Sequence, residues 1–366
     1  MKLFVTNTRG EVDFINDVHK EKGNHLVKPL ITLVIMAGIL SFAFIIAISL
    51  GPVSIPFKET VLIVLNKFKL VPYDAFSDKQ WTVIAEVRLP RVIVAGLVGA
   101  SLAVSGVAMQ GLFRNPLVEP GYIGVSSGAA LGAVSAIFFG WSSLSPWFLP
   151  LSAFIGALFA TAIILIVWRV TKQQHIAVLL LLGLGVNSFF SAMMNVMIAV
   201  SNNEQELRSI VYWLQGGLEA RTWNHVVMIV VPIILGSMAL FFLGNHLNMM
   251  LLGEEQAKTS GLNTRRTRNI ILTITSLITG SAVAVSGIIG FVGLIVPHIL
   301  RLIIGPDHRL LLPASVLGGA SFLILADVLS RMVLQPIILQ VGVVSALIGA
   351  PLFIFLILKS YKGASL

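Results

Sequence analysis

Long apolar runs recur along the whole chain and form its dominant pattern. Between residues 29 and 358 they reach about 18 residues or more, enough to cross a hydrocarbon core roughly 30 Å thick as a helix. They lack the strict alternation of polar and apolar positions that a lipid-facing barrel strand needs. The pattern predicts an all-α, polytopic membrane protein.

Ten membrane spans are expected. The eighth is short, and Pro297 with its flanking glycines predicts a half-length or broken helix that packs against protein instead of lipid. An even number of spans places both termini on the same side. The expected spans are 29–50, 92–112, 122–140, 147–168, 176–200, 225–243, 269–289, 291–304, 310–331 and 336–358.

The distribution of basic residues predicts the orientation. A cytoplasmic N-terminus puts 16 of the 25 Lys and Arg residues inside, whereas Asp and Glu divide evenly. Both termini are therefore expected in the cytoplasm, with residues 1–28 as a cytoplasmic tail. This tail lacks the short apolar core and cleavage site of a signal peptide.

Composition supports the membrane assignment and narrows the chemistry. Only 11% of the residues are charged, against about a quarter in a soluble domain. The chain has no cysteine, so disulfides and thiolate metal sites are excluded. Neither H-E-x-x-H nor G-x-x-x-x-G-K-[ST] occurs. We expect a non-enzymatic chain with no directly bound cofactor or metal, and any ATP must bind another subunit.

When the sequence is aligned with itself at an offset of 181 residues, two segments match. Residues 103–106 and 284–287 both read AVSG, and Gly99 and Gly124 meet Gly280 and Gly305. Five spans separate the copies, so the copies would cross the membrane in opposite directions. This favours an inverted repeat, as in many transporters, although small residues in membrane helices also match by chance.

Glycines spaced four apart predict a close helix contact. Gly124, Gly128 and Gly132 share one helix face, where a second backbone can approach closely in lipid.

The longest loop expected in the cytoplasm covers residues 244–269. Glu254, Glu255 and Lys258 give it a polar face. It is interpreted either as a helix lying on the membrane surface or as a docking helix for a cytoplasmic partner. Its apolar face would consist of Met249, Met250, Leu251, Leu252 and Ala257.

Two arginines flank a proline before the second span. Pro90 suits a first helical turn, which would put Arg88 and Arg91 at a helix N-terminus, where the dipole disfavours cations. They could reach lipid phosphates, or pair with carboxylates of an outside protein. Arg331 follows Asp327 by four residues and is a third candidate, with an intrahelical ion pair as the alternative.

The sequence Asn115-Pro116 breaks the second span at its cytoplasmic end. It is either a simple turn or, with Leu117, part of a gate.

Four segments together carry a family resemblance: RLPR, GASLAVSGVAMQGLFRNPLVEPGYIGVSSGA, SGIIGFVGLIVPHILRLIIGPDHR and GAPLFIFLILK. They closely resemble the FecCD permeases, the membrane subunits of type II ABC importers for iron-siderophores, haem and cobalamin. The resemblance covers residues 30 to 360, which form one permease domain over about 29–360, and the longer N-terminal tail departs from the family.

The resemblance implies a cobalamin-permease-like fold in the bacterial cytoplasmic membrane. Such permeases pair with a second copy or a paralogue, bind two cytoplasmic ATPase subunits, and receive cargo from an extracellular or periplasmic solute-binding protein. The implied roles cover three groups of residues. Docking of the solute-binding protein falls to Arg88, Arg91 and Arg331. Gating falls to Asn115, Leu117, Ile176 and Ala177. Coupling to the ATPase falls to the loop at about 245–268, with Leu252, Gly253, Glu254, Ala257 and Gly261.

The predicted function is therefore an ABC importer permease that translocates an iron-siderophore by ATP-driven alternating access. Haem and cobalamin are the alternative cargoes. An ion-coupled secondary transporter is the alternative from another class; its usual sign, a paired ionisable residue at mid-membrane, is not found in the spans.

Overall fold

A computed structural model describes residues 8–71, 76–171 and 176–363, with side chains for residues 29–71, 76–171, 177–356 and 358. Regular structure in these residues is entirely helical. The elements are α1 (Thr8–Ser49), α2 (Phe57–Lys67), α3 (Asp78–Trp81), η1 (Thr82–Arg88), α4 (Leu89–Phe113), η2 (Pro120–Ile123), α5 (Val125–Phe138), η3 (Trp141–Ser143), α6 (Phe148–Val170), α7 (Ile176–Val200), α8 (Glu204–Leu214), α9 (Trp223–Phe242), α10 (Gly244–Leu251), α11 (Glu254–Thr259), α12 (Thr264–Ser286), α13 (Val292–Ile304), α14 (His308–Met332) and α15 (Val341–Gly363).

The apolar helices lie where the ten spans are expected. Among the described residues, 7 helices are long and apolar enough to cross a membrane. Three shorter apolar helices, Val125–Phe138, Val292–Ile304 and Val341–Leu356, occupy the third, eighth and tenth positions. The short eighth span is confirmed as the 13-residue helix α13.

The start of the second span differs from the prediction. One continuous helix of 36 residues runs from Asp78 to Phe113, so Arg88 and Arg91 lie well inside it. Its true N-terminus is capped by Ser77, which forms a reciprocal capping box with Gln80. The π-helical stretch Thr82–Arg88 ends two residues before Pro90, and the helix continues through the proline as α4.

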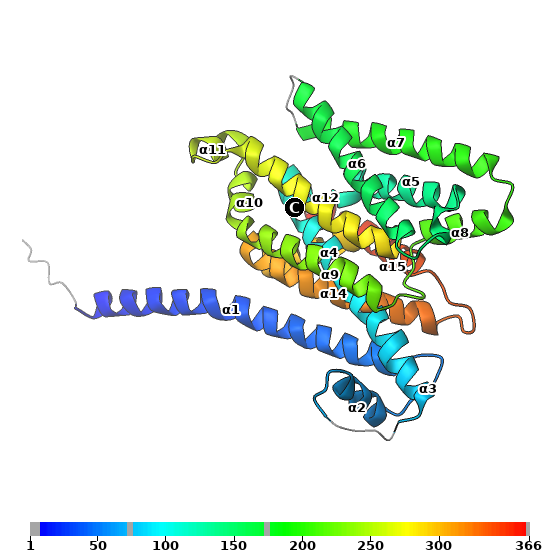
Figure 1. Ribbon diagram of the computed structural model, residues 1–366. Coiled ribbons are helices and arrows are strands. Elements are labelled where there is room, and N and C mark those ends of the chain that lie inside the picture. Colours follow the sequence, from blue (N-terminus) through cyan, green and yellow to red (C-terminus); the bar gives the residue numbers. More distant parts are fainter. Residues whose placement is uncertain (1–7, 72–75, 172–175, 364–366) are drawn as a thin grey trace, which may run out of the picture.

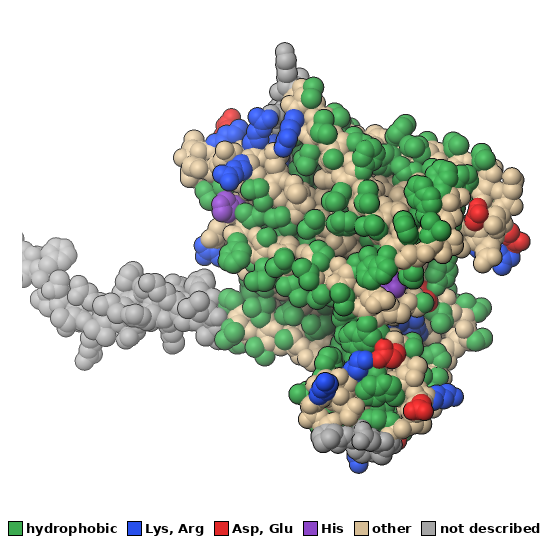
Figure 2. Space-filling model, viewed as in Figure 1, with side chains coloured by type: hydrophobic (Ala, Val, Ile, Leu, Met, Phe, Trp, Pro, Cys, Tyr) green, Lys and Arg blue, Asp and Glu red, His purple; other side chains and the backbone are tan. Residues whose placement is uncertain are grey.

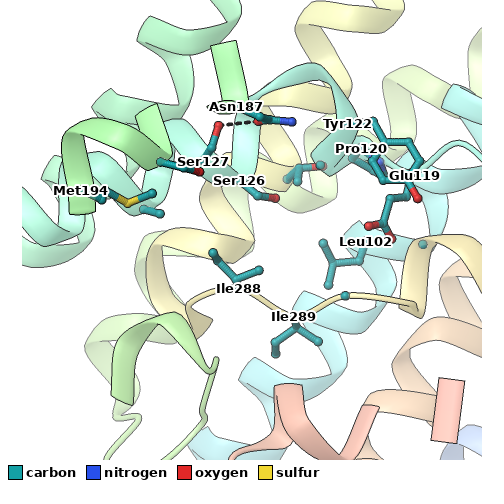
Figure 3. Close-up of a pocket in the computed structure, with 16 residues that line it drawn as sticks. Leu102, Glu119, Pro120, Tyr122, Ser126, Ser127, Asn187, Met194, Ile288 and Ile289 are labelled. Carbon is teal, nitrogen blue, oxygen red and sulfur yellow. Dashed lines mark hydrogen bonds between the residues drawn. The ribbon is translucent and has the colours of Figure 1, made fainter. Parts of the chain in front are cut away.

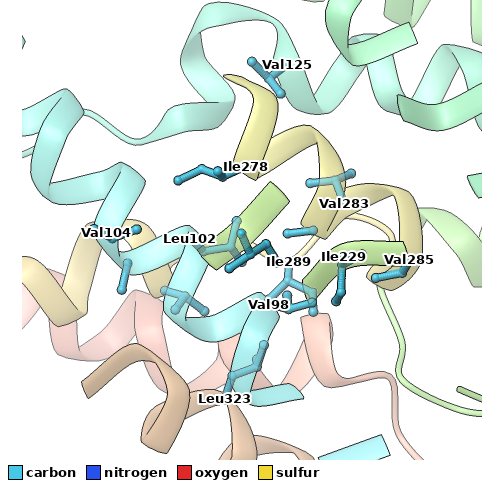
Figure 4. Close-up of a cluster of buried hydrophobic side chains, with 14 of the residues drawn as sticks. Val98, Leu102, Val104, Val125, Ile229, Ile278, Val283, Val285, Ile289 and Leu323 are labelled. Atoms are coloured by element: carbon cyan, nitrogen blue, oxygen red, sulfur yellow. The ribbon is translucent and has the colours of Figure 1, made fainter. Parts of the chain in front are cut away.

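Helix α4 forms the centre of the bundle. It packs against α14, α12, α9 and α13, while α5, α6 and α7 form a second group beside it (Figure 1). Val98 and Leu102 of α4 lie in the buried cluster with Ile229 of α9 and Ile278 of α12 (Figure 4). Helix α1 lies on the outside against α14, and between Pro29 and Ser49 most of its residues are not buried.

Glycines allow the closest helix contacts. A Cβ at Gly106 of α4 would lie 1.9 Å from the carbonyl oxygen of Gly293 in α13. A Cβ at Gly128 would lie 2.3 Å from the Gly156 oxygen, and one at Gly132 2.0 Å from the Ser152 oxygen, both in α6. The predicted close contact is confirmed for Gly128 and Gly132, whereas Gly124 lies just before α5 in a left-handed conformation, with φ of 79°, and faces side chains instead of a second backbone.

The contacts agree with an inverted repeat. Gly99 and Gly280 correspond under the 181-residue shift; Gly99 of α4 faces Gly319 of α14, and Gly280 of α12 faces Ala157 of α6. Helices α4 and α12 run in opposite directions, because the C-terminal end of α4 and the N-terminal end of α12 both lie near α10 and α11. The two copies therefore make related contacts with opposite polarity.

The bundle has two chemically different ends. We call one the arginine end; it carries α2, α3, α8 and the ends of α1 and α14 around Arg88 (Figure 1). The other is the loop end, which carries α10 and α11. Hydrophobic side chains cover the middle of the visible face, and charged side chains gather toward its edges (Figure 2). This distribution suits a membrane-spanning body with two wet ends.

Candidate functional site

The three predicted docking arginines are engaged inside the protein. Arg88 is 4% exposed and donates hydrogen bonds to the carbonyl oxygens of Ile48 and Ser49, each at 2.9 Å, and to that of Val53. The Ile48 and Ser49 carbonyls lie at the C-terminal end of α1, where a cation is favourable.

Asp327 of α14 joins the other two arginines. Arg91 donates to Asp327 Oδ1 from Nη2 at 2.8 Å and from Nε at 3.0 Å. Arg331 Nε lies 3.1 Å from Asp327 Oδ2, which is the intrahelical pair considered from the sequence. Asp327 is 1% exposed, so each cation reaches its carboxylate away from water. The network ties α4 to α14.

Two further charges complete this end. Glu219, after α8, lies 3.8 Å from Arg91. Burial lowers the pKa of Arg221, and Glu219 partly opposes that effect. Within this cluster the four arginines, Arg88, Arg91, Arg221 and Arg331, outnumber the two carboxylates of Asp327 and Glu219, so the cluster carries surplus positive charge. A docking role for the three arginines stays a prediction, because a partner carboxylate could reach them only when these internal contacts open.

The loop after α4 forms the turn expected from Asn115-Pro116. Arg114 adopts a left-handed conformation that ends α4, and Asn115 Oδ1 accepts the Leu117 N–H at 2.9 Å. Leu117 is 41% exposed and available for contacts. Of the second predicted constriction, Ala177 is exposed, while the Ile176 side chain and residues 172–175 lie outside the described part. The assignment of these residues to a gate therefore stays a prediction.

Beyond this turn the chain returns to the middle of the bundle and lines a pocket of about 270 Å³. Its wall includes Leu102, which lies in the central part of α4. It also includes residues 288–290, where the chain is not helical between α12 and α13. Figure 3 shows the Glu119 carboxylate and the Ser126 hydroxyl turned toward the same space, with Ile288 and Ile289 on the other side. Sequence reasoning missed Glu119 as a residue at membrane depth.

The polar wall of the pocket comes from several helices. Ser127 of α5 donates to Asn187 Oδ1 of α7 at 2.5 Å. Glu119 accepts a hydrogen bond from the backbone N–H of Phe291, directly before α13. Helix α7 reaches this region because Gly183 has no side chain; a Cβ there would lie 2.1 Å from the Tyr122 oxygen. The pocket can therefore offer a carboxylate and neutral polar groups to a bound species.

At the loop end, α10 is attached to α14 and α11 is attached to α12. Asn248 of α10 donates to Asp307 Oδ1 at 2.7 Å and accepts the His308 N–H at 2.9 Å, which fixes α10 to the start of α14. Glu254 of α11 lies 3.0 Å from Arg268 of α12, and Arg268 lies 5.6 Å from the centre of the Trp168 ring of α6. The loop is thus attached to α14 and α12 and is linked to α6 through Arg268.

The five predicted coupling residues share this loop but differ in exposure. Ala257 is fully buried and anchors α11, whereas Leu252 is 64% exposed. Gly253 and Gly261 have φ of 118° and 85°, a region that favours glycine. Burial raises the pKa of the Glu254 carboxyl, but Lys258 and Arg268 outweigh it and bring the pKa below its ordinary value. Glu254 is therefore ionised at neutral pH.

Comparison with known proteins identifies the family. The model of the FecCD transport family matches residues 39–359, nearly the whole helical body. The chain belongs to the FecCD transport family. It is a permease subunit of a type II ABC importer and a multi-pass membrane protein, and permeases of this family are not themselves enzymes.

Characterised members of the FecCD family differ in cargo. The chain is 42% identical over 278 residues, 75% of its length and 73% of the relative's, to the cobalamin import system permease protein BtuC of Halobacterium salinarum. It is 41% identical to the hemin transport system permease protein HmuU of Yersinia pestis, over 79% of this chain and 87% of that one.

Two further relatives extend the match. The ABC transporter permease protein YvrB of Bacillus subtilis is 40% identical over 88% of this chain and 92% of its own. A solved structure of an ABC transporter in an inward-facing conformation matches with a TM-score of 0.79 and 34% identity. It covers 89% of this chain and 98% of that chain. The FecCD fold is therefore shared along almost the entire body.

Proposed function

We propose that this FecCD permease translocates a ferric siderophore across the bacterial cytoplasmic membrane by ATP-driven alternating access. Two separate ATPase subunits would hydrolyse ATP in the cytoplasm, and a solute-binding protein would deliver the cargo from outside. A second permease copy or a paralogue would complete the pathway.

The observation that carries the proposal is the contrast between the two ends. The loop end presents α10 and α11 with Leu252 exposed and Glu254 ionised, which suits a protein cleft. At the arginine end, the cluster of Arg88, Arg91, Arg221 and Arg331 has more cations than carboxylates, which suits acidic side chains of a protein partner. We place the loop end and both termini in the cytoplasm, as the distribution of Lys and Arg favours.

Docking of the binding protein would change the ion pairs around Asp327. Glutamates of a binding protein could replace Asp327 and the α1 carbonyls as partners of Arg88, Arg91 and Arg331. Because Asp327 joins α4 to α14, such an exchange would loosen the contact between these helices. Binding outside would then be linked to movement of the body, with Asn115 and Leu117, and Ile176 and Ala177, as the gate.

Haem and cobalamin remain the alternative cargoes, favoured by the similarity to HmuU and BtuC. A different class, an ion-coupled secondary transporter, would move cargo without an ATPase.

The test is uptake by a strain that lacks the chain. Cells complemented with it should accumulate labelled ferric siderophore, and the purified chain should retain ATPase subunits in detergent. If the cells accumulate only haem or only cobalamin, that compound is the cargo instead of a ferric siderophore. Uptake without any associated ATPase would contradict the importer assignment.

A further inference from the structure

The pocket at the middle of the bundle holds a carboxylate with no cationic partner. Glu119 accepts a hydrogen bond from the Phe291 N–H, and no ion pair to Glu119 occurs among the described residues. An ionisable side chain at membrane depth is costly and usually faces a ligand pathway or a partner. Glu119 therefore requires a compensating group.

A second group in the same wall is also unsatisfied. Thr279 of α12 is 1% exposed and lines the pocket, yet its hydroxyl has no hydrogen-bond partner. A buried hydroxyl without a partner costs free energy that a bound ligand or water could recover. Ser126 and Ser191 add further hydroxyls to the lining.

The open side of the pocket is polar as well. Asn187, Ser191 and Asn195 follow one another at four-residue intervals on one face of α7, and the last two are exposed. Three such groups on a lipid-facing surface would be unfavourable. This face of α7 is therefore better suited to an aqueous passage than to lipid.

We propose that the Glu119 pocket is a transit subsite that binds a hydrogen-bond-donating or cationic group while cargo crosses the membrane. The donor would be an amide, hydroxyl or ammonium group of the cargo itself, or a free monovalent cation that enters with it. Carboxyl and hydroxyl oxygens accept hydrogen bonds from such groups. The inference rests on the proposed transport function.

The test compares variants in the complete importer, with its ATPase subunits and binding protein, in liposomes. Thr279→Val keeps the shape and removes only the unpartnered hydroxyl, so a purely structural role predicts no loss. We expect cargo uptake at low concentration to fall about 3-fold in Thr279→Val and about 10-fold in Glu119→Gln. Glu86→Gln, the same change at a carboxylate paired with Lys67 at the arginine end, should transport like the wild type.

Changing the cations of the buffer distinguishes a free cation from a donor group of the cargo. If a free cation occupies the site, replacing Na⁺ and K⁺ by N-methylglucamine should reduce wild-type uptake to the Glu119→Gln level. If the cargo supplies the donor, wild-type uptake should not change.

Unchanged uptake in either assembled variant would overturn the subsite. Should Glu119→Gln fail to co-purify with the ATPase, Thr279→Val decides alone. A wild-type complex that transports no cargo would instead contradict the proposed function.

Discussion

Asp327 is the residue on which the arginine end depends. Its two oxygens contact Arg91 of α4 and Arg331 of its own helix, in a place closed to water. Removal of one member of such a network leaves charges buried without compensation, which costs far more than the loss of a surface pair.

Asp327→Asn should therefore lower the free energy of unfolding by about 3–5 kcal/mol. The matched change Glu204→Gln removes a carboxylate from an exposed pair with Arg208, and should cost only about 0–1 kcal/mol. Chemical unfolding of the detergent-solubilised chain measures both. Equal stability of the two variants would show that the buried network contributes little.

The loop end should respond to acid through Glu254 and Asp307. Burial raises the pKa of each carboxyl, but hydrogen bonds and neighbouring cations outweigh it and leave both below their ordinary values of 4.5 and 3.8. A folded-state pKa below the unfolded one gives stability that is complete above the unfolded value and declines as pH falls toward the folded one.

Hydrogen exchange of the backbone amides in residues 245–268, corrected for the intrinsic rate, should thus show constant protection between about pH 8 and pH 5.5. Protection should decline only below the ordinary value of 4.5 for Glu254. A decline already between neutral pH and pH 6 would mean that other groups hold the loop.

At the level of helices, the contacts of α4 depend on the absence of side chains. The Gly106 Cα faces the backbone of Gly293, so an added methyl group has no room. In an open helix the same change favours folding, because glycine has poor helix propensity.

Gly106→Ala should therefore destabilise the chain by about 1–3 kcal/mol. Gly38→Ala in α1, where nothing lies within 4 Å of the added carbon, should leave stability unchanged or raise it by up to about 1 kcal/mol. Thermal unfolding in detergent compares the two variants. A stabilising Gly106→Ala would exclude the close approach of α4 to α13.

The sequence predicted the spans well because each apolar run is long enough to define one helix. It placed the start of the second span wrongly, because Ser77 and Gln80 begin the helix earlier and the helix continues through Pro90 as α4. Glu119 was missed for another reason. Its position in a loop suggests a wet end, and only the return of that loop to Leu102 reveals its depth.

In the whole molecule, the α10–α11 loop is attached to α14 through Asn248 and to α12 through Glu254. Arg268 links α11 to α12 and, through its contact with Trp168, to α6. Because Arg268 is buried, movement of Glu254 alone would leave it unpaired, and the helices are expected to move together.

Arg268→Met should therefore reduce cargo transported per ATP hydrolysed in the assembled importer by about 5-fold or more, if the lost pair is worth at least about 1 kcal/mol in coupling. Lys258→Met removes the exposed partner of Glu254 and should leave this ratio near the wild-type value. Equal ratios in both variants would show that the loop acts through α10 alone.

The central claim is that this FecCD permease moves cargo only with ATP hydrolysed by separate subunits. Its most direct test is cargo accumulation in liposomes that contain the permease, its ATPase and its binding protein, supplied in turn with ferric siderophore, haem and cobalamin. The account predicts accumulation of ferric siderophore that needs both ATP and the binding protein. Accumulation driven by an ion gradient in the absence of ATP would contradict it.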